Sequence, residues 1–492
     1  MARGKFDLLV IGAGLAGLSA AYAAAEKDKN KTIALVSLDS NYESASMKAQ
    51  GGIACALGND DSEKLHMQDT LSAGAGLCDE RAVKTMAKDA APRLRKLREM
   101  GLKFDADARN EIDLGIEGGH SARRVLHIDG DATGKGMLEF MHKIAGDKKN
   151  IRKIEGKELN ELLVSQGRCV GAVIGGHAVL ADAVLLATGG FAPLYGNATN
   201  PQGNKGSAIA AAFRAGARMQ DMEFVQFHPT VMIGQDENYL ITESVRGEGA
   251  KLVDEKGRQF MQEYSKRGEL DTRDVVSRAI FSEIEKGHRI FLDICGLANI
   301  DLKKRFPNLH DKIQKEKIDL ARGLLPISPA AHYTIGGVKA DINGRTNIPG
   351  LFAAGECACT GLHGANRLAC NSLLEAVVFG QRGGETAIRE RGNKVKVVRN
   401  EGGRQGQKQT EEQKTKIGEL VGKILWERAG IVRSAEGLRT GLREIDKIGK
   451  STETAIAELV LLSALRREES RGVHFRSDFP KMAKRFAQHT II

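Results

Sequence analysis

Residues 6–37 read FDLLVIGAGLAGLSAAYAAAEKDKNKTIALVS. The run Phe6–Ile11 is short and apolar, the run Gly12–Gly17 has the spacing G-x-G-x-x-G, and the segment Leu18–Glu26 is rich in alanine. A second run with β-branched residues, Thr32–Ser37, follows them. The order strand, glycine turn, helix, strand is typical of a Rossmann βαβ unit, which binds a dinucleotide at its turn.

The glycine turn predicts a phosphate site at the start of the helix. The first glycine permits a tight turn, the second lets the backbone approach a pyrophosphate, and the third lets the helix pack closely on the strand. The helix N-terminus adds unpaired N–H groups and the positive end of the helix dipole. The second strand ends at Ser37 rather than at an acidic residue, which argues against a generic nicotinamide site. From this turn we expect five residues to bind the cofactor: Gly12, Ala13, Gly14, Leu15 and Gly17.

The composition is that of a large globular protein. A length of 492 residues allows about two to four domains. With 41% hydrophobic and 28% charged residues, disorder is excluded as the main state. The segment Leu8–Ala25 is long and apolar enough to suggest a membrane span. Because three glycines interrupt it and no cleavage site follows, we expect neither a span nor a signal peptide.

The net charge of +10 raises the question of a nucleic-acid partner. About half of this excess lies in Arg389–Lys416, which holds nine basic and four acidic residues. Aromatic residues, at 5%, are few for stacking on bases, so we expect a solvated basic segment and no nucleic acid. The seven cysteines form no C-x-x-C pair. This favours a reducing compartment, and hence the cytoplasm, and no metal site.

Two further segments, Ala183–Gly190 and Gly350–Glu356, are apolar runs that end in glycine turns. Since they lie far apart in the sequence, they indicate a nucleotide-binding domain interrupted by an insertion. We predict an α/β fold: a Rossmann-like cofactor domain interrupted by an α+β capping domain and followed by a C-terminal helical domain. The predicted ranges are 1–218 and 335–391 for the cofactor domain, 219–334 for the cap and 411–492 for the helical domain.

The end of the chain has the pattern of a linker and a helical region. Gly392–Thr410 is rich in Gly, Gln and Lys, and apolar stripes at helical spacing follow it. We expect Ser434 and Thr452 to be N-cap residues.

A series of ordered motifs resembles the flavoprotein family of succinate dehydrogenase, fumarate reductase and L-aspartate oxidase. The resemblance covers nearly the whole chain, and its blocks are, besides the glycine turn, Ala49–Ala54, Ala187–Gly190, Gln226–Thr230, Thr242–Gly249, Thr272–Asp274, Ala331–Thr334, Gly336–Val338, Gly355–Glu356, His363–Arg367, Asn371–Glu375 and Glu469–Gly472.

The resemblance implies FAD as the cofactor. Respiratory members attach FAD covalently through a His just before the Gln-Gly-Gly block, and Ala45 occupies that place here, so FAD is expected to bind non-covalently. Relatives commonly have Gly-Asp-Gly where this chain has Gly206-Ser207-Ala208, which puts one cofactor contact in doubt. The residues expected to bind FAD, in addition to the turn, are Ser37, Ser44, Ser46, Gln50, Gly51, Gly52, Ile53, Thr188, Gly189, Glu356, Asn371, Ser372 and Leu373.

The block Glu117-Gly118-Gly119-His120-Ser121 is similar to that of the L-aspartate oxidases within this family. Dicarboxylate reductases usually have Phe-Gly-Gly at this place. Aspartate differs from succinate by one ammonium group, and a carboxylate can pair with that group. The alternative is that Glu117 is an N-cap residue or a surface acid.

The resemblance also implies a pocket for a four-carbon dicarboxylate. Arg367 is expected to grip one carboxylate in a bidentate manner. We expect Arg273 to donate or accept a proton through a relay to Glu243 or Glu248, the alternative being a purely electrostatic role. Donors to the carboxylates are expected from His228, Thr242 and His332. The histidines given no role are His66, His142, His177, His288, His310 and His489.

These expectations imply the oxidation of L-aspartate to iminoaspartate, with oxygen or fumarate as the electron acceptor, in quinolinate and NAD biosynthesis. The expected functional partner is quinolinate synthase. The alternatives are a fumarate reductase or succinate dehydrogenase flavoprotein subunit, and a nucleic-acid-binding or scaffold protein that has kept a flavin fold.

Overall fold

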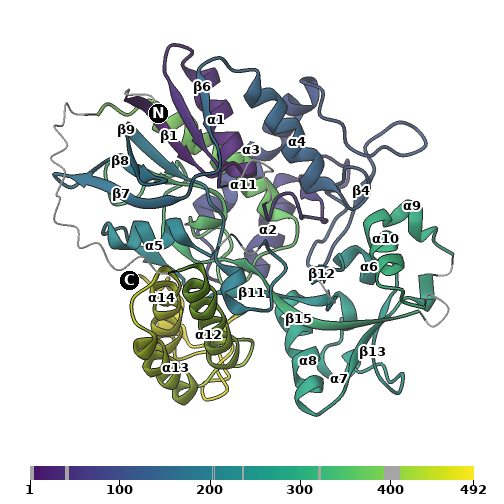
Figure 1. Ribbon diagram of the computed structural model, residues 1–492. Coiled ribbons are helices and arrows are strands. Elements are labelled where there is room, and N and C mark those ends of the chain that lie inside the picture. Colours follow the sequence, from purple (N-terminus) through teal and green to yellow (C-terminus); the bar gives the residue numbers. More distant parts are fainter. Residues whose placement is uncertain are drawn as a thin grey trace.

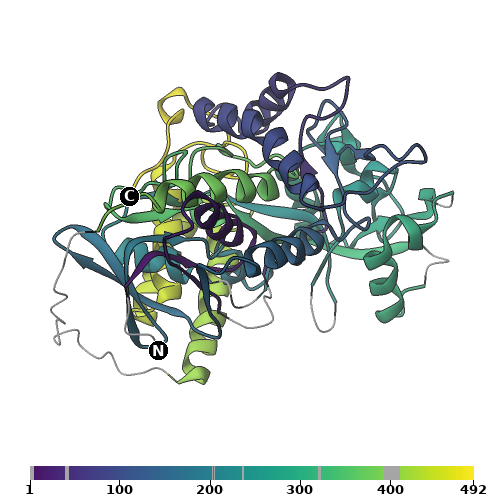
Figure 2. The ribbon, with the colours of Figure 1, turned by 90° about the horizontal axis from the view of Figure 1, so that it is seen from above.

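The computed structural model describes residues 5–38, 44–201, 203, 205–234, 238–297, 299–319, 323–392 and 410–492. Its elements form a Rossmann-like domain, a cap and a helical region, which are distinct in Figures 1 and 2. Residues 393–409, most of the predicted linker, lie outside the described residues. In the part of the chain that is described, no helix is both long enough and apolar enough to cross a bilayer.

The central sheet of the Rossmann-like domain has the order β6-β2-β1-β9-β8-β7, and β17 also pairs with β9. Strands β6, β2, β1, β9 and β17 run parallel, whereas β8 and β7 are antiparallel additions. The bounds are β1 Phe6–Ile11, β2 Ile33–Val36, β6 Ile151–Ile154, β7 Leu159–Ser165, β8 Arg168–Ile174, β9 His177–Leu186 and β17 Leu351–Ala353. The predicted βαβ unit is confirmed, and β17 joins the sheet from beyond the insertion, as predicted.

Helices cover the sheet and hold its two sequence segments together. Helix α1 (Leu15–Lys27) packs against α11 (Asn371–Ala387), and the two lie side by side in Figures 1 and 2. The close approach needs glycine, because a Cβ atom at Gly384 would overlap the backbone of Ala20. The other helices of this domain are α2 (Glu63–Ala73), α3 (Glu80–Glu99), α4 (Thr133–Gly146) and α5 (Ser207–Arg214).

Two small sheets lie beside the main sheet. One has the order β3-β5-β4 and the other β10-β16-β18. Their bounds are β3 Ile53–Ala54, β4 Leu114–Gly115, β5 Val125–Leu126, β10 Met219–Gln220, β16 Gly337–Lys339 and β18 Ala358–Cys359.

The cap is built on an antiparallel sheet with the order β12-β11-β15-β14-β13. Its strands are β11 Val225–Met232, β12 Tyr239–Leu240, β13 Lys251–Asp254, β14 Ile290–Asp293 and β15 Leu324–Thr334. Its helices are α6 Glu243–Gly247, α7 Met261–Tyr264, α8 Arg273–Glu285, α9 Leu302–Arg305 and α10 Pro307–Lys315. This is the α+β arrangement expected for the insertion, although the domain boundaries at residues 218 and 334 stay a prediction.

Three helices form the C-terminal region: α12 Glu411–Ala429, α13 Ala435–Ile448 and α14 Thr452–Arg466. Ser434 caps α13, as predicted, because its side chain accepts a hydrogen bond from the Gly437 N–H. The predicted N-cap Thr452 is wrong by one residue, since Ser451 and Thr454 form a capping box and Thr452 is the first helical residue. Figure 1 shows this region beside α5 and β11.

A buried ion pair joins this region to the start of the cap. Arg467 Nε donates to Glu223 Oε1 at 2.5 Å, and Arg433 Nη1 donates to the carbonyl oxygen of Glu223 at 2.7 Å. All three side chains are buried. Buried charges need such partners, so the two regions depend on each other for stability.

Candidate active site

A cavity of about 330 Å³ lies between the carboxyl ends of the parallel strands and the cap. This is where open α/β sheets bind their ligands. The predicted cofactor residues that line it are Gly12, Ala13, Gly14, Leu15, Ser37, Ser44, Ser46, Gln50, Gly51, Gly52, Thr188, Gly189, Glu356, Ser372 and Leu373. The predicted substrate residues that line it are Glu117, His228, Thr242, Glu243, Arg273, His332 and Arg367.

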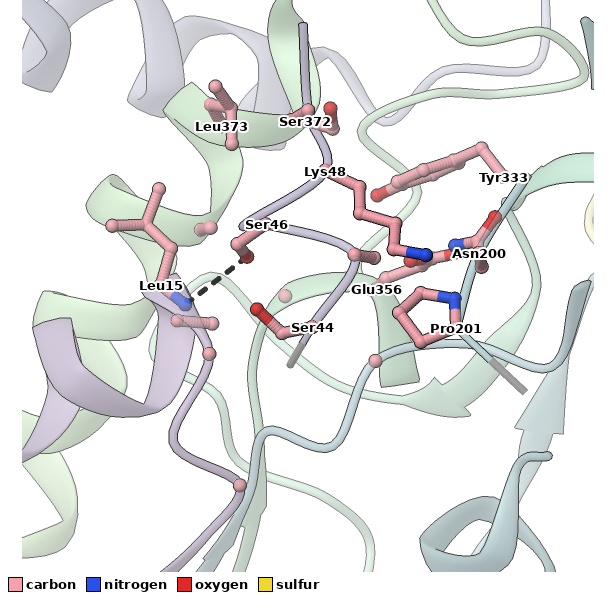
Figure 3. A pocket seen from close by; sticks show the side chains of 18 of the residues that line it. Leu15, Ser44, Ser46, Lys48, Asn200, Pro201, Tyr333, Glu356, Ser372 and Leu373 are labelled. Carbon is pink, nitrogen blue, oxygen red and sulfur yellow. Dashed lines mark hydrogen bonds between the residues drawn. The ribbon is translucent and has the colours of Figure 1, made fainter. Parts of the chain in front are cut away.

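The glycine turn forms one end of this cavity. Gly12 has φ +110°, a conformation that L side chains rarely adopt, and a Cβ atom at Gly17 would overlap the carbonyl oxygen of Gly12. The nearest atom to a Cβ atom at Gly14 would be Ser46 Oγ at 3.6 Å. Leu15 N donates to this Oγ at 3.3 Å, the bond drawn in Figure 3. The start of α1 therefore lines the cavity where a pyrophosphate would bind, with the Leu15 N–H bonded to Ser46 Oγ.

Polar atoms in the cavity wall fit a polar cofactor. Gln50 Oε1 and Thr188 Oγ1 are buried and have no hydrogen-bond partner among the described residues. Glu356 Oε1 accepts hydrogen bonds from Thr334 N at 2.9 Å and Thr334 Oγ1 at 3.2 Å. Burial raises the pKa of Glu356 to about 7, although the Thr334 hydrogen bonds oppose the shift. In Figure 3 the side chain of Lys48 extends toward Glu356.

The other end of the cavity holds a cluster of arginines around one carboxylate. Glu243 Oε1 accepts from Arg273 Nε at 2.9 Å and from Arg246 Nη2 at 3.1 Å. Gln226 Oε1 accepts from Arg273 Nη1 at 3.0 Å and from Arg367 Nε at 3.3 Å. All five side chains are buried. Helices α6 and α8 of the cap supply Glu243, Arg246 and Arg273, whereas Arg367 comes from the Rossmann-like domain.

This cluster is strongly cationic. Burial favours the protonated form of Glu243, but the charges of Arg273 and Arg246 outweigh it and lower its pKa to about 2. Burial, and then the charge of Arg273, lowers the pKa of Arg367 to about 10, so it stays protonated at neutral pH. Three guanidinium groups and one carboxylate leave a net charge of +2, the complement of a dicarboxylate.

Two neutral histidines face the same space. Burial, followed by the charge of Arg273, lowers the pKa of His228 and of His332 well below the ordinary value. The Thr230 N–H donates to His228 Nδ1 at 3.3 Å, so the His228 proton is on Nε2. His228 Nε2 is buried without a partner within the described chain. A ligand oxygen in the cavity would satisfy this donor.

Glu117 lies in the same cavity and is only 6% exposed. Ser244 Oγ donates to Glu117 Oε1 at 3.0 Å. Burial raises the pKa of Glu117, and the negative charge of Glu243 raises it further, while Arg273 opposes the shift. Glu117 is therefore neither a surface acid nor an N-cap residue, which were the alternatives.

Comparisons with known proteins agree with this geometry. A family model described as "FAD binding domain" matches residues 7–373, and one described as "Fumarate reductase flavoprotein C-term" matches residues 452–492. The chain is 41% identical to L-aspartate oxidase 2 of Ralstonia nicotianae, over 98% of this chain and 92% of the relative. It is 39% identical to L-aspartate oxidase of Bacillus subtilis, over 97% and 92%. The chain belongs to the L-aspartate oxidase family.

A solved structure of E. coli quinol fumarate reductase supports the wider relationship. It is 30% identical to this chain, with a TM-score of 0.91, over 100% of this chain and 94% of that one. The chain thus has an FAD-binding domain and the fumarate reductase flavoprotein fold.

Three residues expected to bind FAD lie outside the lining of the cavity, and their contact with FAD stays a prediction. Gly17, Ile53 and Asn371 do not line the cavity: Gly17 packs under Gly12, and Ile53 is a fully buried residue of β3. The Asn371 side chain instead bonds to His66 Nε2 at 2.8 Å and to Thr70 Oγ1 at 3.0 Å.

The two carboxylates expected as alternative relay partners of Arg273, Glu243 and Glu248, differ in their contacts. Glu248 is exposed and pairs with Arg305 Nε at 3.2 Å. Of the two carboxylates proposed as relay partners, only Glu243 contacts Arg273.

Three residues of the site have no role assigned from the sequence: Tyr333 and Ser244 lie within motifs, and Cys370 lies just before one. The Arg367 guanidinium lies 4.4 Å from the centre of the Tyr333 ring, which lines the cavity. Tyr333 is held by Glu375, whose Oε2 accepts from the Tyr333 hydroxyl at 2.5 Å. Ser244 and Cys370 flank Glu117. The sequence feature that could have identified these residues is their place within or next to a motif. Such a position does not show in which direction a side chain points.

Proposed function

We propose that this chain is an FAD-dependent enzyme that oxidises L-aspartate to iminoaspartate, with oxygen or fumarate as the electron acceptor. Membership of the L-aspartate oxidase family supports this reaction. The single observation that carries the choice of substrate is Glu117. It places a carboxylate inside a cavity that otherwise suits a dianion.

The residues divide between the two carboxylates and the amine of the substrate. Arg367 and Arg273 neutralise the carboxylates, and His228, His332 and Thr242 donate hydrogen bonds to them. Glu117 pairs with the ammonium group. Succinate and fumarate have no group for Glu117 to pair with, so this residue distinguishes aspartate from them.

The reaction removes a hydride from the α-carbon and a proton from the nitrogen. When bound, FAD supplies the electron-accepting ring. The protein holds the α-carbon toward that ring and excludes water. Glu117 suits the role of proton acceptor because it touches the nitrogen and because burial raises its pKa.

Arg273 stays protonated during this step. Burial alone would lower its pKa, but the adjacent Glu243 carboxylate outweighs burial and raises it. We propose that Arg273 fixes a carboxylate of aspartate. When fumarate is the acceptor, the same guanidinium is placed to donate a proton and to regain one through Glu243, which lies 2.9 Å away.

FAD is proposed to bind without a covalent bond. Ala45 lines the cavity at the place where respiratory relatives have histidine, and its methyl group cannot attach to the cofactor. Ser207 lines the same cavity at the start of α5, where the longer Asp of relatives would reach further. Acid precipitation of the holoenzyme should leave yellow FAD in the supernatant, and colour in the pellet would contradict this proposal.

The deciding experiment compares L-aspartate and succinate as substrates, with oxygen and with an artificial electron acceptor. We expect turnover of L-aspartate, and turnover of succinate alone would refute the proposal. The Glu117→Gln variant should lose aspartate oxidation by about 10- to 100-fold and fumarate reduction far less, since a charge-assisted hydrogen bond contributes about 1.5–3 kcal/mol. Glu248→Gln, an exposed change outside the cavity, is the matched control.

The product, an imine, reacts readily with water, so an enzyme that consumes it without delay is needed. We propose quinolinate synthase for this role, through transfer of the product, as a step toward NAD. A cytoplasmic location rests on the seven cysteines, all of them free.

A further inference from the structure

The Glu117 carboxylate has two neutral side-chain partners. Ser244 Oγ donates to Glu117 Oε1 at 3.0 Å, and the Cys370 thiol lies beside this carboxylate, where its interaction lowers the pKa of Glu117. A Cβ atom built on Gly51 would lie 3.5 Å from Cys370 Sγ and 3.6 Å from Glu117 Oε1. The carboxylate is therefore enclosed between Ser244, Cys370 and the Gly51 backbone.

These partners come from three separate segments of the chain. Glu117 is in a loop of the Rossmann-like domain, Ser244 is in α6 of the cap, and Cys370 precedes α11. Cys370 has φ +61°, an unusual conformation for a residue with a side chain, and it lines the cavity. The hydrogen bond from Ser244 exists only when the cap lies over the Rossmann-like domain.

The backbone of the Glu117 loop is held independently of these two donors. His120 Nε2 lies 3.0 Å from the Ala369 carbonyl oxygen, and the Ser121 N–H donates to Asp69 Oδ2 at 2.8 Å. Removing the hydroxyl of Ser244 or the thiol of Cys370 would thus free the Glu117 side chain without releasing its loop.

The charged and titratable groups around Glu117 show why the orientation of its carboxylate affects substrate binding. They are Glu243, Arg246, Arg273 and Cys370. The nearby guanidinium groups attract the carboxylate, so a Glu117 side chain without one of its donors is held less firmly toward the substrate amine.

We propose that Ser244 and Cys370 are positioning residues that hold Glu117 for the substrate amine and so set the preference for amino dicarboxylates over plain dicarboxylates. This inference rests on the proposed function, because it takes Glu117 as the partner of the ammonium group. Neither residue needs to touch the substrate for this effect.

The test uses the holoenzyme and the variants Ser244→Ala, Cys370→Ala and Cys370→Ser. Each alanine variant should raise the KM for L-aspartate about tenfold, with a smaller change in kcat, since one hydrogen bond to a charged group is lost. The Kd of succinate, followed by the flavin spectrum, should change less than about twofold. Cys370→Ser keeps a donor and should restore the KM.

The pH profile distinguishes positioning from a general structural effect. Hydrogen bonds to a carboxylate favour its ionised form, so losing one raises the pKa of Glu117. The acidic limb of kcat/KM for L-aspartate should therefore move to higher pH in Ser244→Ala and Cys370→Ala. Ser282→Ala, a change in α8 on a serine that contacts Tyr264 at 3.2 Å, is the control and should not move it.

FAD content and melting temperature identify any variant that does not fold. If folded alanine variants keep the wild-type KM and acidic limb, or lose aspartate and succinate equally, the inference is overturned while the proposed function stands. If the wild-type enzyme does not oxidise L-aspartate, the proposed function itself fails.

Discussion

The affinities for ligands with and without an amine should depend on pH in opposite directions. Arg246, Arg273, Arg367 and Glu243 together carry a net charge of +2, and Glu117 adds either 0 or −1. A plain dicarboxylate, with two negative charges, fits the state in which Glu117 is protonated. An amino dicarboxylate, with a net charge of −1, fits the state in which Glu117 is ionised and pairs with the ammonium group.

The size of the effect follows from proton linkage. Burial and Glu243 raise the pKa of Glu117, so its protonated form persists above the usual range of a glutamic acid. Lowering the pH through this pKa favours the plain dicarboxylate and disfavours the amino dicarboxylate. If each ligand requires a different protonation state, the ratio of their affinities changes about tenfold per pH unit, which is about 1.4 kcal/mol.

The assay needs two ligands of one shape that are not oxidised. We choose 2-methyl-L-aspartate, which lacks the α-hydrogen, and 2,2-dimethylsuccinate, in which a methyl group replaces the ammonium group. Both are titrated anaerobically against the flavin absorbance from pH 6 to 9. Glu356, with a pKa of about 7, also titrates here, but it acts on the carboxylates of both ligands and cancels in the ratio.

The affinity ratio should favour the amino ligand increasingly as the pH rises. In the Glu117→Gln variant, which cannot ionise at this position, the ratio should be independent of pH. A flat ratio in the wild-type enzyme, or an unchanged slope in Glu117→Gln, would refute the assignment of Glu117 to the amine.

Two further predictions concern packing around the cofactor and the substrate. Gly17→Ala should lower the free energy of unfolding by about 1–3 kcal/mol, because its Cβ atom would overlap the carbonyl of Gly12. It should also reduce bound FAD, measured as the ratio of flavin to protein absorbance. Gly146→Ala is the control and should have neither effect, since the space around Gly146 is open. The Tyr333→Leu variant should bind succinate at least about tenfold more weakly than Tyr333→Phe. Only Phe keeps an aromatic face beneath Arg367, and a desolvated cation–π contact contributes about 2 kcal/mol. Equal affinities of the two variants would contradict this role.

The Rossmann core was predictable because local sequence decides it. The run Phe6–Ile11 is β1 itself, and the glycine spacing that follows it has few other structural uses. The return of β17 to the sheet was predictable for the same reason. The cap sheet was predicted only as α+β, because strands such as β11, buried along its whole length, do not show the alternation that identifies a half-buried strand.

At the site, sequence motifs predicted which residues line the cavity better than how their side chains lie. Asn371 stands beside Ser372 at the start of α11, yet Asn371 turns to His66 while Ser372 faces the cavity. Consecutive residues of a helix lie about 100° apart around its axis, so their side chains point in different directions. Glu248 and Glu243 belong to one motif, and only Glu243 reaches Arg273, because Glu248 is exposed at the end of α6.

The insertion of the cap also has a consequence for biosynthesis. β9 leaves the ribosome about 160 residues before β17, its neighbour in the sheet. The separation in sequence between α1 and α11, which pack together, is longer still. At translation rates of about 5–20 residues per second, the apolar surface of α1 stays uncovered for about 20–70 s. During that time the nascent chain is open to aggregation. Added chaperones should therefore increase the yield of folded protein.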